Sequence, residues 1–308
     1  MKKTLLIGST CVDVIMNVKK MPQAGDDMLV QSQEHKLGGC TFNISDIMHH
    51  FEVPYTLCSP VGTGLYGDFV TKELEKRNVP VFARINDKEN GCCYCVVDQN
   101  GERTFLCEHG AEYVFRREFF DSISLEEIDS VFICGLELEE PTAKAEVDYV
   151  QELYDYFKAK NEPFTIYFAP GPRIENIDET LLERVLDLHP VIHLNKGEAL
   201  NFSKKSFVMD AASWINLQTE NSVIITMGEQ GCYFQDAVTG KAAIVDGVKA
   251  SVVDTIGAGD SHFATVISCL KKGLTLNEAC QTANKVSSAV VAVKGSTLTD
   301  EEFKAINL

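Results

Sequence analysis

The residues best suited to chemistry form the segment Asp254-Thr255-Ile256-Gly257-Ala258-Gly259-Asp260, which precedes a run with apolar residues at helical spacing. Gly257 and Gly259 keep this turn free of bulky side chains, so backbone N–H groups at the helix start can converge on an oxyanion. Asp260 is unusual there, because a carboxylate repels an anion unless it has another task, such as accepting a proton from an attacking hydroxyl. The pairing suggests phosphoryl transfer. The alternative is that the helix dipole alone favours an acid in this first turn.

Two other segments carry polar residues at predicted helix starts, and each also has an ordinary structural explanation. The double glycine of Leu37–Asn43 permits a ligand to approach the backbone, and Asn43 offers a donor and an acceptor, but the segment also suits a simple strand-to-helix turn. Asn195 and Glu198 stand three residues apart, so on a helical turn they share a face and can hold the water shell of Mg²⁺. They fit a helix N-cap with a capping-box Glu equally well.

The elements that must position these residues alternate between strand and helix patterns through most of the chain. This alternation predicts an α/β fold with a mostly parallel sheet covered by helices on both faces, in one domain over residues 1–308. Asp13 lies just past the first predicted strand, Thr4–Ile7, where such sheets bind ligands, although a lone acid is more often a turn or cap residue. The turn Thr226–Gly231 joins two predicted strands and can present Thr226 and backbone N–H groups to a phosphate.

A second group of strands interrupts the alternation. Met28–Gln33, Gly91–Val97 and Arg103–Cys107 have the composition of strands, and Asn100-Gly101 is a strong hairpin signal between the last two. With the stretch after Asp13, they predict a small β-sheet built from residues 13–36 and 91–108 that covers the main domain as a lid. An exposed apolar face on such a lid would also suit a homodimer.

Size and charge exclude several classes of protein. With 308 residues, 45% of them apolar, the chain can bury a core that needs no disulfides. Its net charge is −17 and its basic residues cluster only in pairs, so it lacks the basic surface of a nucleic-acid binder. No run is long enough for a membrane span, and the first apolar run is too short for a signal peptide. Eleven cysteines then predict reduced thiols and a cytoplasmic protein.

One glycine pattern points to a different class of enzyme. Gly62–Gly67 has the spacing of a dinucleotide-binding turn, and Asp87 follows at about the required distance. The match is weak, because it is not at the first strand-to-helix turn and because short patterns arise by chance among 21 glycines. It leaves a nicotinamide oxidoreductase that binds NAD at Gly62–Gly67 as an alternative. A sugar-binding regulator without catalysis is another, and it predicts acceptor binding without ADP formation.

Taken in order, the motifs resemble the ribokinase-type (PfkB) carbohydrate kinase family over nearly the whole chain. Gly38-Gly39-x-x-x-Asn43 resembles its N-terminal signature, and Asp254 to Asp260 resembles its catalytic signature. Between them, Asn195-x-x-Glu198 is similar to its metal and phosphate motif and Thr226-x-Gly228-x-x-Gly231 to its nucleotide motif. The resemblance implies a ribokinase-like three-layer αβα domain with a β-sheet lid, and an ATP- and Mg²⁺-dependent kinase for a small sugar or sugar-like acceptor.

The resemblance also implies roles for single residues. Asp260 would be the general base, and the N–H groups of Gly257, Ala258 and Gly259 would form the anion hole for the transferred phosphoryl group. Asn195 and Glu198 would organise Mg²⁺ and the phosphates through water, and ATP would be bordered by Thr226, Gly228, Gly231 and Asn284. The acceptor's hydroxyls would be bound by Asp13, Gly39, Asn43 and Glu137. Asp254 would belong to a loop that binds a monovalent cation such as K⁺.

The acceptor is the least defined part of this expectation. Ribokinases carry Gly-Gly-Lys-Gly at the first signature, whereas this chain has Gly39-Cys40-Thr41-Phe42, and Cys11 stands where they have Asn. Strict ribose specificity is therefore not implied. Phe42 and Phe168 could stack on a base or simply pack, which leaves a nucleoside kinase of the same family as an alternative.

Overall fold

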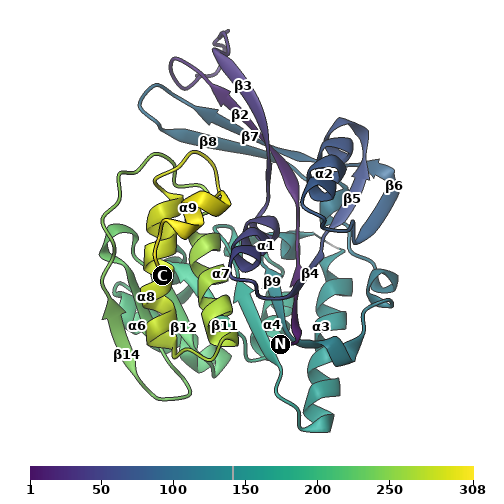
Figure 1. Cartoon of the computed structure of the whole chain (residues 1–308), viewed down its shortest axis with the longest axis vertical. Coiled ribbons are helices and arrows are strands. Elements are labelled where there is room, and N and C mark those ends of the chain that lie inside the picture. Colours follow the sequence, from purple (N-terminus) through teal and green to yellow (C-terminus); the bar gives the residue numbers. More distant parts are fainter. Residues whose placement is uncertain (141) are drawn as a thin grey trace.

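The computed structural model describes residues 1–140 and 142–308, and its centre is an eight-stranded sheet (Figure 1). The strands are β1 (Lys3–Ile7), β4 (Tyr55–Cys58), β9 (Ile128–Cys134), β10 (Thr165–Ala169), β11 (Val191–Asn195), β12 (Val223–Thr226), β13 (Cys232–Gln235) and β14 (Ala242–Val245). Their order is β14-β13-β12-β11-β10-β9-β1-β4, and all neighbours from β4 to β12 run parallel. The chain reverses sides between β1 and β9, which places the predicted ligand crevice beyond their carboxyl ends.

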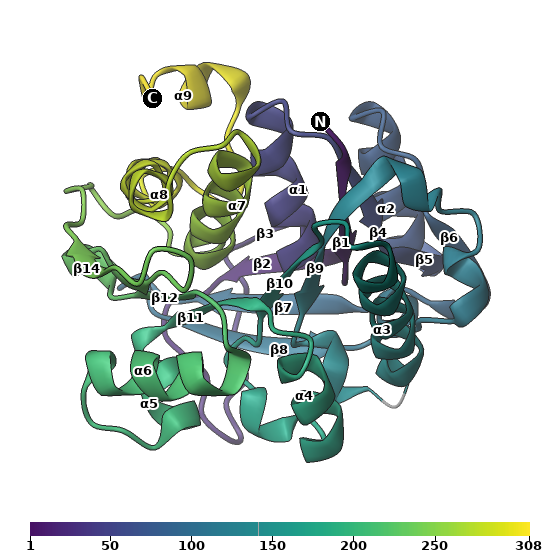
Figure 2. The ribbon, with the colours of Figure 1, turned by 90° about the horizontal axis from the view of Figure 1, so that it is seen from below.

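Helices cover both faces of this sheet, as the alternating sequence pattern predicts (Figure 2). One face carries α1 (Cys40–His50), α7 (Ala258–Lys271) and α8 (Leu276–Val290), and α9 (Asp300–Lys304) packs against α8. The other face carries α3 (Ala143–Lys160), α4 (Glu179–Leu186), α5 (Lys196–Ser203) and α6 (Val208–Thr219). Alternate residues of β1 serve the two cores, Leu6 on the α1 and α7 side and Leu5 and Ile7 on the α3 side. The expected three-layer αβα architecture is confirmed.

A second sheet of four strands, here called the accessory sheet, extends beyond the main sheet at the top of Figure 1. It consists of β2 (Cys11–Asn17), β3 (Ser32–Gly38), β7 (Cys92–Val97) and β8 (Arg103–Glu108), in the order β3-β2-β7-β8. The strand expected at Met28–Gln33 is wrong, because β3 is set by its pairing with β2, from Asn17 opposite Ser32 to Cys11 opposite Gly38. Residues 28–30 lie beyond the end of β2 and find no partner strand in the described chain.

A third pair of strands, β5 (Pro60–Thr63) and β6 (Ala83–Glu89), flanks α2 (Gly64–Lys76) and contains the dinucleotide-like glycines. These glycines serve close packing: the Gly62 N–H donates to Asn90 Oδ1 at 2.6 Å, and a Cβ on Gly67 would lie 2.3 Å from the Gly62 carbonyl oxygen. Asp87 is a β6 residue whose exposed side chain pairs with Arg116 at 3.7 Å. The turn therefore lacks the room and the acidic partner of a nicotinamide site.

Two expectations about the whole chain concern what it lacks. Within the described residues, no helix has the length and apolar character that a bilayer crossing needs. All eleven cysteines carry free thiols in the structure.

Candidate active site

The helix start of α7 carries the predicted catalytic residues. Gly257 caps the helix with φ +73°, and a Cβ on it would lie 2.6 Å from Cβ of Ser296, so a glycine is required there. The Ala258 N–H donates a long hydrogen bond to the Thr255 carbonyl at 3.4 Å, whereas helix geometry leaves the next N–H groups without an intrahelical acceptor. Gly259 faces open space, since a Cβ on it would meet no atom within 4 Å. The turn is therefore open and has N–H groups to offer an anion.

Asp260 follows in the first turn of α7 and is bound from the other side of the crevice by α1. Asn43 Nδ2 donates to Asp260 Oδ2 at 2.7 Å, although the two residues are 217 positions apart. Burial raises the pKa of Asp260 to about 6, while the hydrogen bond from Asn43 works in the opposite direction and favours the carboxylate. Such a carboxyl group can accept a proton near neutral pH.

The predicted acceptor residues meet where β1 and β9 end. Glu137 is fully buried, accepts a hydrogen bond from the Ser9 N–H at 2.7 Å, and has its pKa raised by burial. Gly39 begins α1 with φ +98°, and a Cβ there would lie 2.6 Å from the Ser9 carbonyl oxygen. The close approach of Gly39 to Ser9 thus brings α1, and Asn43 on it, against the end of β1.

Several buried polar atoms in this region have no protein partner among the described residues. They are Thr10 Oγ1, Thr41 Oγ1, Asn43 Oδ1 and Glu137 Oε2. Buried polar atoms are normally hydrogen-bonded, so a set of them without partners needs an explanation. Hydroxyl groups of a bound ligand or ordered water would supply the missing partners.

Asp13 lies on β2, the strand by which the accessory sheet borders this region. Burial raises the pKa of Asp13 to about 7, helped by nearby Cys107, Asp260 and Asp254, while Lys36 acts in the opposite direction. The carboxylate packs on Gly38, where a Cβ would lie 2.2 Å from Asp13 Oδ2. The contribution of Asp260 to this pKa shift places the two carboxyl groups within electrostatic reach of each other.

A pocket of about 760 Å³ opens at the α7 start, and none of the predicted acceptor residues lines it. It is lined by the predicted nucleotide residues Thr226, Gly228, Gly231 and Asn284, and also by Ala258 and Gly259. Sequence reasoning missed the part of its wall formed by residues 247–250 and Val252. The sequence offers only a weak indication of this wall, namely the apolar residue Val252 shortly before the glycine-rich turn. In the structure Val252 is 66% exposed and lines the pocket.

Asn284 is held in this wall by its own hydrogen bonds. Its Nδ2 donates to the carbonyl oxygens of Val245 at 3.1 Å and Asp246 at 3.0 Å, and its Oδ1 lies 3.2 Å from His262 Nε2. His262 in turn lies 3.0 Å from buried His193. Asn284 therefore joins α8, α7 and the segment after β14 at the edge of the pocket.

Asn195 and Glu198 form the capping box that the sequence also allowed. The Glu198 N–H donates to Asn195 Oδ1 and the Asn195 N–H to Glu198 Oε2, both at 2.9 Å. The second carboxylate oxygen of Glu198 is not used by the cap. Burial raises the pKa of Glu198, and Asp260 adds to the shift, so this carboxyl group lies within electrostatic reach of the α7 start. Among residues 1–140 and 142–308, no three His, Cys, Asp or Glu side chains are grouped so that they could hold a metal ion by themselves.

Asp254 is the predicted residue whose surroundings differ most from expectation. Its side chain is only 3% exposed and pairs with Arg103, the first residue of β8 in the accessory sheet. Sequence reasoning missed Arg103, because 151 residues separate the partners and an arginine at a strand start is ordinary.

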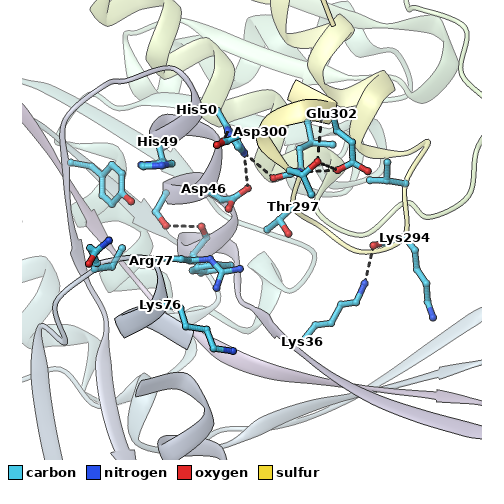
Figure 3. Close-up of a pocket in the computed structure, with 18 residues that line it drawn as sticks. Lys36, Asp46, His49, His50, Lys76, Arg77, Lys294, Thr297, Asp300 and Glu302 are labelled. Atoms are coloured by element: carbon cyan, nitrogen blue, oxygen red, sulfur yellow. Dashed lines mark hydrogen bonds and ion pairs between the residues drawn. The ribbon is translucent and has the colours of Figure 1, made fainter. Parts of the chain in front are cut away.

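A second hollow of about 780 Å³ lies between α1, the end of α2 and the C-terminal segment (Figure 3). Its described lining includes Lys36, Arg77 and Lys294, but none of the residues with a predicted catalytic, nucleotide or acceptor role. The predicted residues gather instead around the α7 start, where Asn43 of α1 is bonded to Asp260 and the neighbouring Ala258 and Gly259 line the 760 Å³ pocket.

Known proteins resemble this chain along its whole length. The model of the pfkB family carbohydrate kinases matches residues 1–302. A protein of Escherichia coli K12 named as an uncharacterized sugar kinase, YegV, is 27% identical over 299 residues, which are 96% of this chain and 90% of that protein.

Solved structures share the fold at lower identity. Ribokinase from Giardia lamblia aligns with a TM-score of 0.85 at 19% identity, covering 100% of this chain and 99% of that one. A putative ribokinase II of E. coli in complex with ATP and Mg²⁺ aligns with a TM-score of 0.79 at 23% identity, covering 100% and 99%. Because the family model spans nearly the whole chain, the protein belongs to the pfkB family of carbohydrate kinases and is an ATP-dependent kinase.

Proposed function

We propose that the enzyme transfers the γ-phosphoryl group of ATP to a hydroxyl of a small sugar or sugar-like acceptor, with Asp260 as the general base. The observation that carries this proposal is the position of Asp260 between two sites. Asn43, on the acceptor side, donates a hydrogen bond to it, and its neighbours Ala258 and Gly259 line the nucleotide pocket. A hydroxyl and a phosphate can therefore meet at one carboxylate.

The chemistry follows from this placement. Asp260 accepts the proton of the acceptor hydroxyl as the hydroxyl oxygen attacks the phosphorus. It can do so because a pKa of about 6 leaves the carboxyl group largely deprotonated at neutral pH. The N–H groups of Gly257, Ala258 and Gly259 stabilise the charge that develops on the phosphoryl oxygens. Covalent catalysis is not required, since positioning and charge stabilisation suffice for this reaction.

Glu198 and Asn195 are the residues that would hold Mg²⁺ through water. The capping box fixes Glu198 by one oxygen and leaves the other for a water ligand. Bound Mg²⁺ would neutralise negative charge on the phosphates. Thr226, Gly228, Gly231 and Asn284 would border the nucleotide, in keeping with their place in the pocket wall.

The acceptor site is proposed to consist of Asp13, Gly39, Asn43 and Glu137. A polyhydroxylated acceptor suits this region, because its hydroxyl groups can both donate and accept and would satisfy the unpaired atoms of Thr10, Thr41, Asn43 and Glu137. The related E. coli protein carries the name of a sugar kinase. The accessory sheet, which supplies Asp13, would act as the lid that excludes water from the reacting phosphate.

The test is ADP formation in the presence of ATP, Mg²⁺ and a panel of pentoses, hexoses, keto-acids and nucleosides. We expect turnover with at least one sugar or sugar-like compound, well above the hydrolysis of ATP without acceptor. Turnover with nucleosides alone would instead favour a nucleoside kinase. Binding of sugars without ADP formation would contradict the proposal and favour a regulator.

A further inference from the structure

A buried ion pair joins the accessory sheet to the catalytic turn. Arg103 begins β8, and Asp254 begins the segment that ends at Asp260. Their side chains are 15% and 3% exposed, so both charges are largely removed from water. A buried carboxylate is costly unless a cation or several hydrogen bonds compensate it. The pair is therefore a buried contact of this turn rather than a surface contact, and removing one partner would leave the other charge buried without compensation.

Every oxygen of the Asp254 carboxylate is already in use. Oδ1 accepts from the Arg103 guanidinium and from the Ile256 N–H at 2.8 Å, and Oδ2 accepts from the Gly295 N–H at 2.9 Å. Ile256 directly precedes Gly257, the residue that caps α7. The carboxylate thus holds the backbone just before the predicted anion hole, and the arginine is the only charged group among its three donors.

The other edge of the accessory sheet holds the same part of the main domain. Lys36 of β3 donates to the Lys294 carbonyl oxygen at 2.9 Å, as Figure 3 shows, and Lys294 pairs with Glu34 of β3. Gly295 lies so close that a Cβ on it would be 2.9 Å from Lys36 Nζ. The two edge strands of the accessory sheet therefore contact this region in different ways: Arg103 of β8 binds the Asp254 carboxylate, and Lys36 of β3 binds the backbone at Lys294.

The Arg103 guanidinium occupies the place on the Asp254 carboxylate where a monovalent cation would bind. The family resemblance implies one in this loop, but a cation at Oδ1 would meet the positive guanidinium that already occupies it, and like charges at such distances repel strongly in a buried place. Each oxygen of the carboxylate already accepts from a protein donor, two on Oδ1 and one on Oδ2, and one of these donors supplies a positive charge.

We propose that Arg103 is a positioning residue that supplies, from the accessory sheet, the positive charge that Asp254 needs. Closure of this sheet over the acceptor would then order the phosphate-binding turn, and the enzyme would work without K⁺. The role in catalysis rests on the function proposed above, but the ion pair and its effect on the turn can be measured without turnover.

The first test uses hydrogen–deuterium exchange and thermal unfolding, in potassium chloride and in an equal concentration of tetramethylammonium chloride. Arg103→Gln should speed exchange in residues 91–108 and 254–260 and lower the midpoint of unfolding. The control is Arg116→Gln, which breaks an exposed ion pair with Asp87 at 3.7 Å and should change neither. In Arg103→Gln the Asp254 carboxylate has lost the guanidinium, so K⁺ should slow exchange in residues 254–260 of this variant. K⁺ should not change exchange in the wild type.

A double-mutant comparison shows whether Arg103 acts through Asp254. The single variant Asp254→Asn and the double variant that adds Arg103→Gln should have the same exchange rates in residues 254–260. Asp254→Asn already removes the ion pair, so the loss of the arginine has no further effect. The proposal is overturned if K⁺ raises the unfolding midpoint of the wild type, if Arg103→Gln behaves like Arg116→Gln, or if the two changes are additive.

Kinetics with the acceptor found by the panel complete the test. Arg103→Gln should lower kcat about 10- to 100-fold with the KM for ATP within about threefold, as expected when a catalytic turn is displaced. Arg103→Lys should recover part of the loss, since it restores the charge but not the guanidinium geometry. A raised KM for ATP with unchanged kcat would overturn the proposal, because it would show that the arginine binds nucleotide instead.

Discussion

At the scale of single residues, the account depends on the ionisation of Asp260. The group must be deprotonated to accept a proton, so kcat/KM for the acceptor should rise as the pH increases through about 6 and then level off. Removing the Asn43 hydrogen bond in Asn43→Ala takes away an interaction that favours the carboxylate. The midpoint should therefore move to higher pH by about one unit, the size of one hydrogen bond to a charged group.

The control for this prediction is Asn201→Ala, an exposed change on α5 that should leave the pH profile unchanged. The pKa of the nearby Asp13 is raised to about 7, so this group could also affect the pH profile of kcat/KM. Comparing the profile of Asp13→Asn with that of the wild type shows whether the rise belongs to Asp13 or to Asp260. A profile of Asn43→Ala with the wild-type midpoint would show that Asp260 is not the group being measured.

At the scale of elements, the start of α7 can be compared with its end. Gly257 and Gly273 flank the helix with φ +73° and +85°, so an alanine at either place is strained by about 1–2 kcal/mol. Only at Gly257 would the new Cβ collide, with Ser296 at 2.6 Å, whereas nothing lies within 4 Å at Gly273. Gly257→Ala should lower kcat about 10- to 100-fold through a displaced turn. Gly273→Ala should lower the stability of the protein but not its kcat. Steady-state kinetics measure the effect on kcat, and thermal unfolding measures the effect on stability.

The capping box of α5 allows its structural and metal roles to be distinguished. Glu198→Gln retains a side-chain oxygen for the cap but removes the charge, so the apparent affinity for Mg²⁺ should fall about 10- to 100-fold with little change in the unfolding midpoint. The matched control is Glu278→Gln in the capping box of α8, which should leave the Mg²⁺ dependence of the rate unchanged. Equal Mg²⁺ dependence in both variants would reduce Glu198 to a helix cap.

At the scale of the whole molecule, the accessory sheet has an unpaired edge strand. Phe105 and Leu106 on β8 are 50% and 60% exposed, which is the feature expected of a surface that pairs with a second copy. We predict a homodimer through this sheet. Changing both residues to Ser should shift the sedimentation coefficient from dimer to monomer, while Leu217→Ser on α6, also exposed, should not. A wild-type monomer at all concentrations would contradict the prediction.

The sequence sufficed for features that a few adjacent residues encode. Gly257 is needed for a backbone turn, and the Asn195–Glu198 spacing specifies a capping box, so both could be predicted from local patterns. The strand at Met28–Gln33 was wrong, because its limits depend on the partner strand β2. The Arg103–Asp254 pair could not be predicted, because it joins two surfaces that only the packed fold brings together.

The central claim is that the carboxylate of Asp260 takes the proton at a glycine-rich helix start, and the most direct test is the kcat of Asp260→Asn. Asp210→Asn is the matched control, since Asp210 occupies the same first-turn position of α6 but is exposed. The account predicts that Asp260→Asn lowers kcat by about 10²- to 10⁴-fold with the affinity for ATP retained, and that Asp210→Asn has no effect. A kcat for Asp260→Asn within a few-fold of the wild type would place the base elsewhere and contradict it.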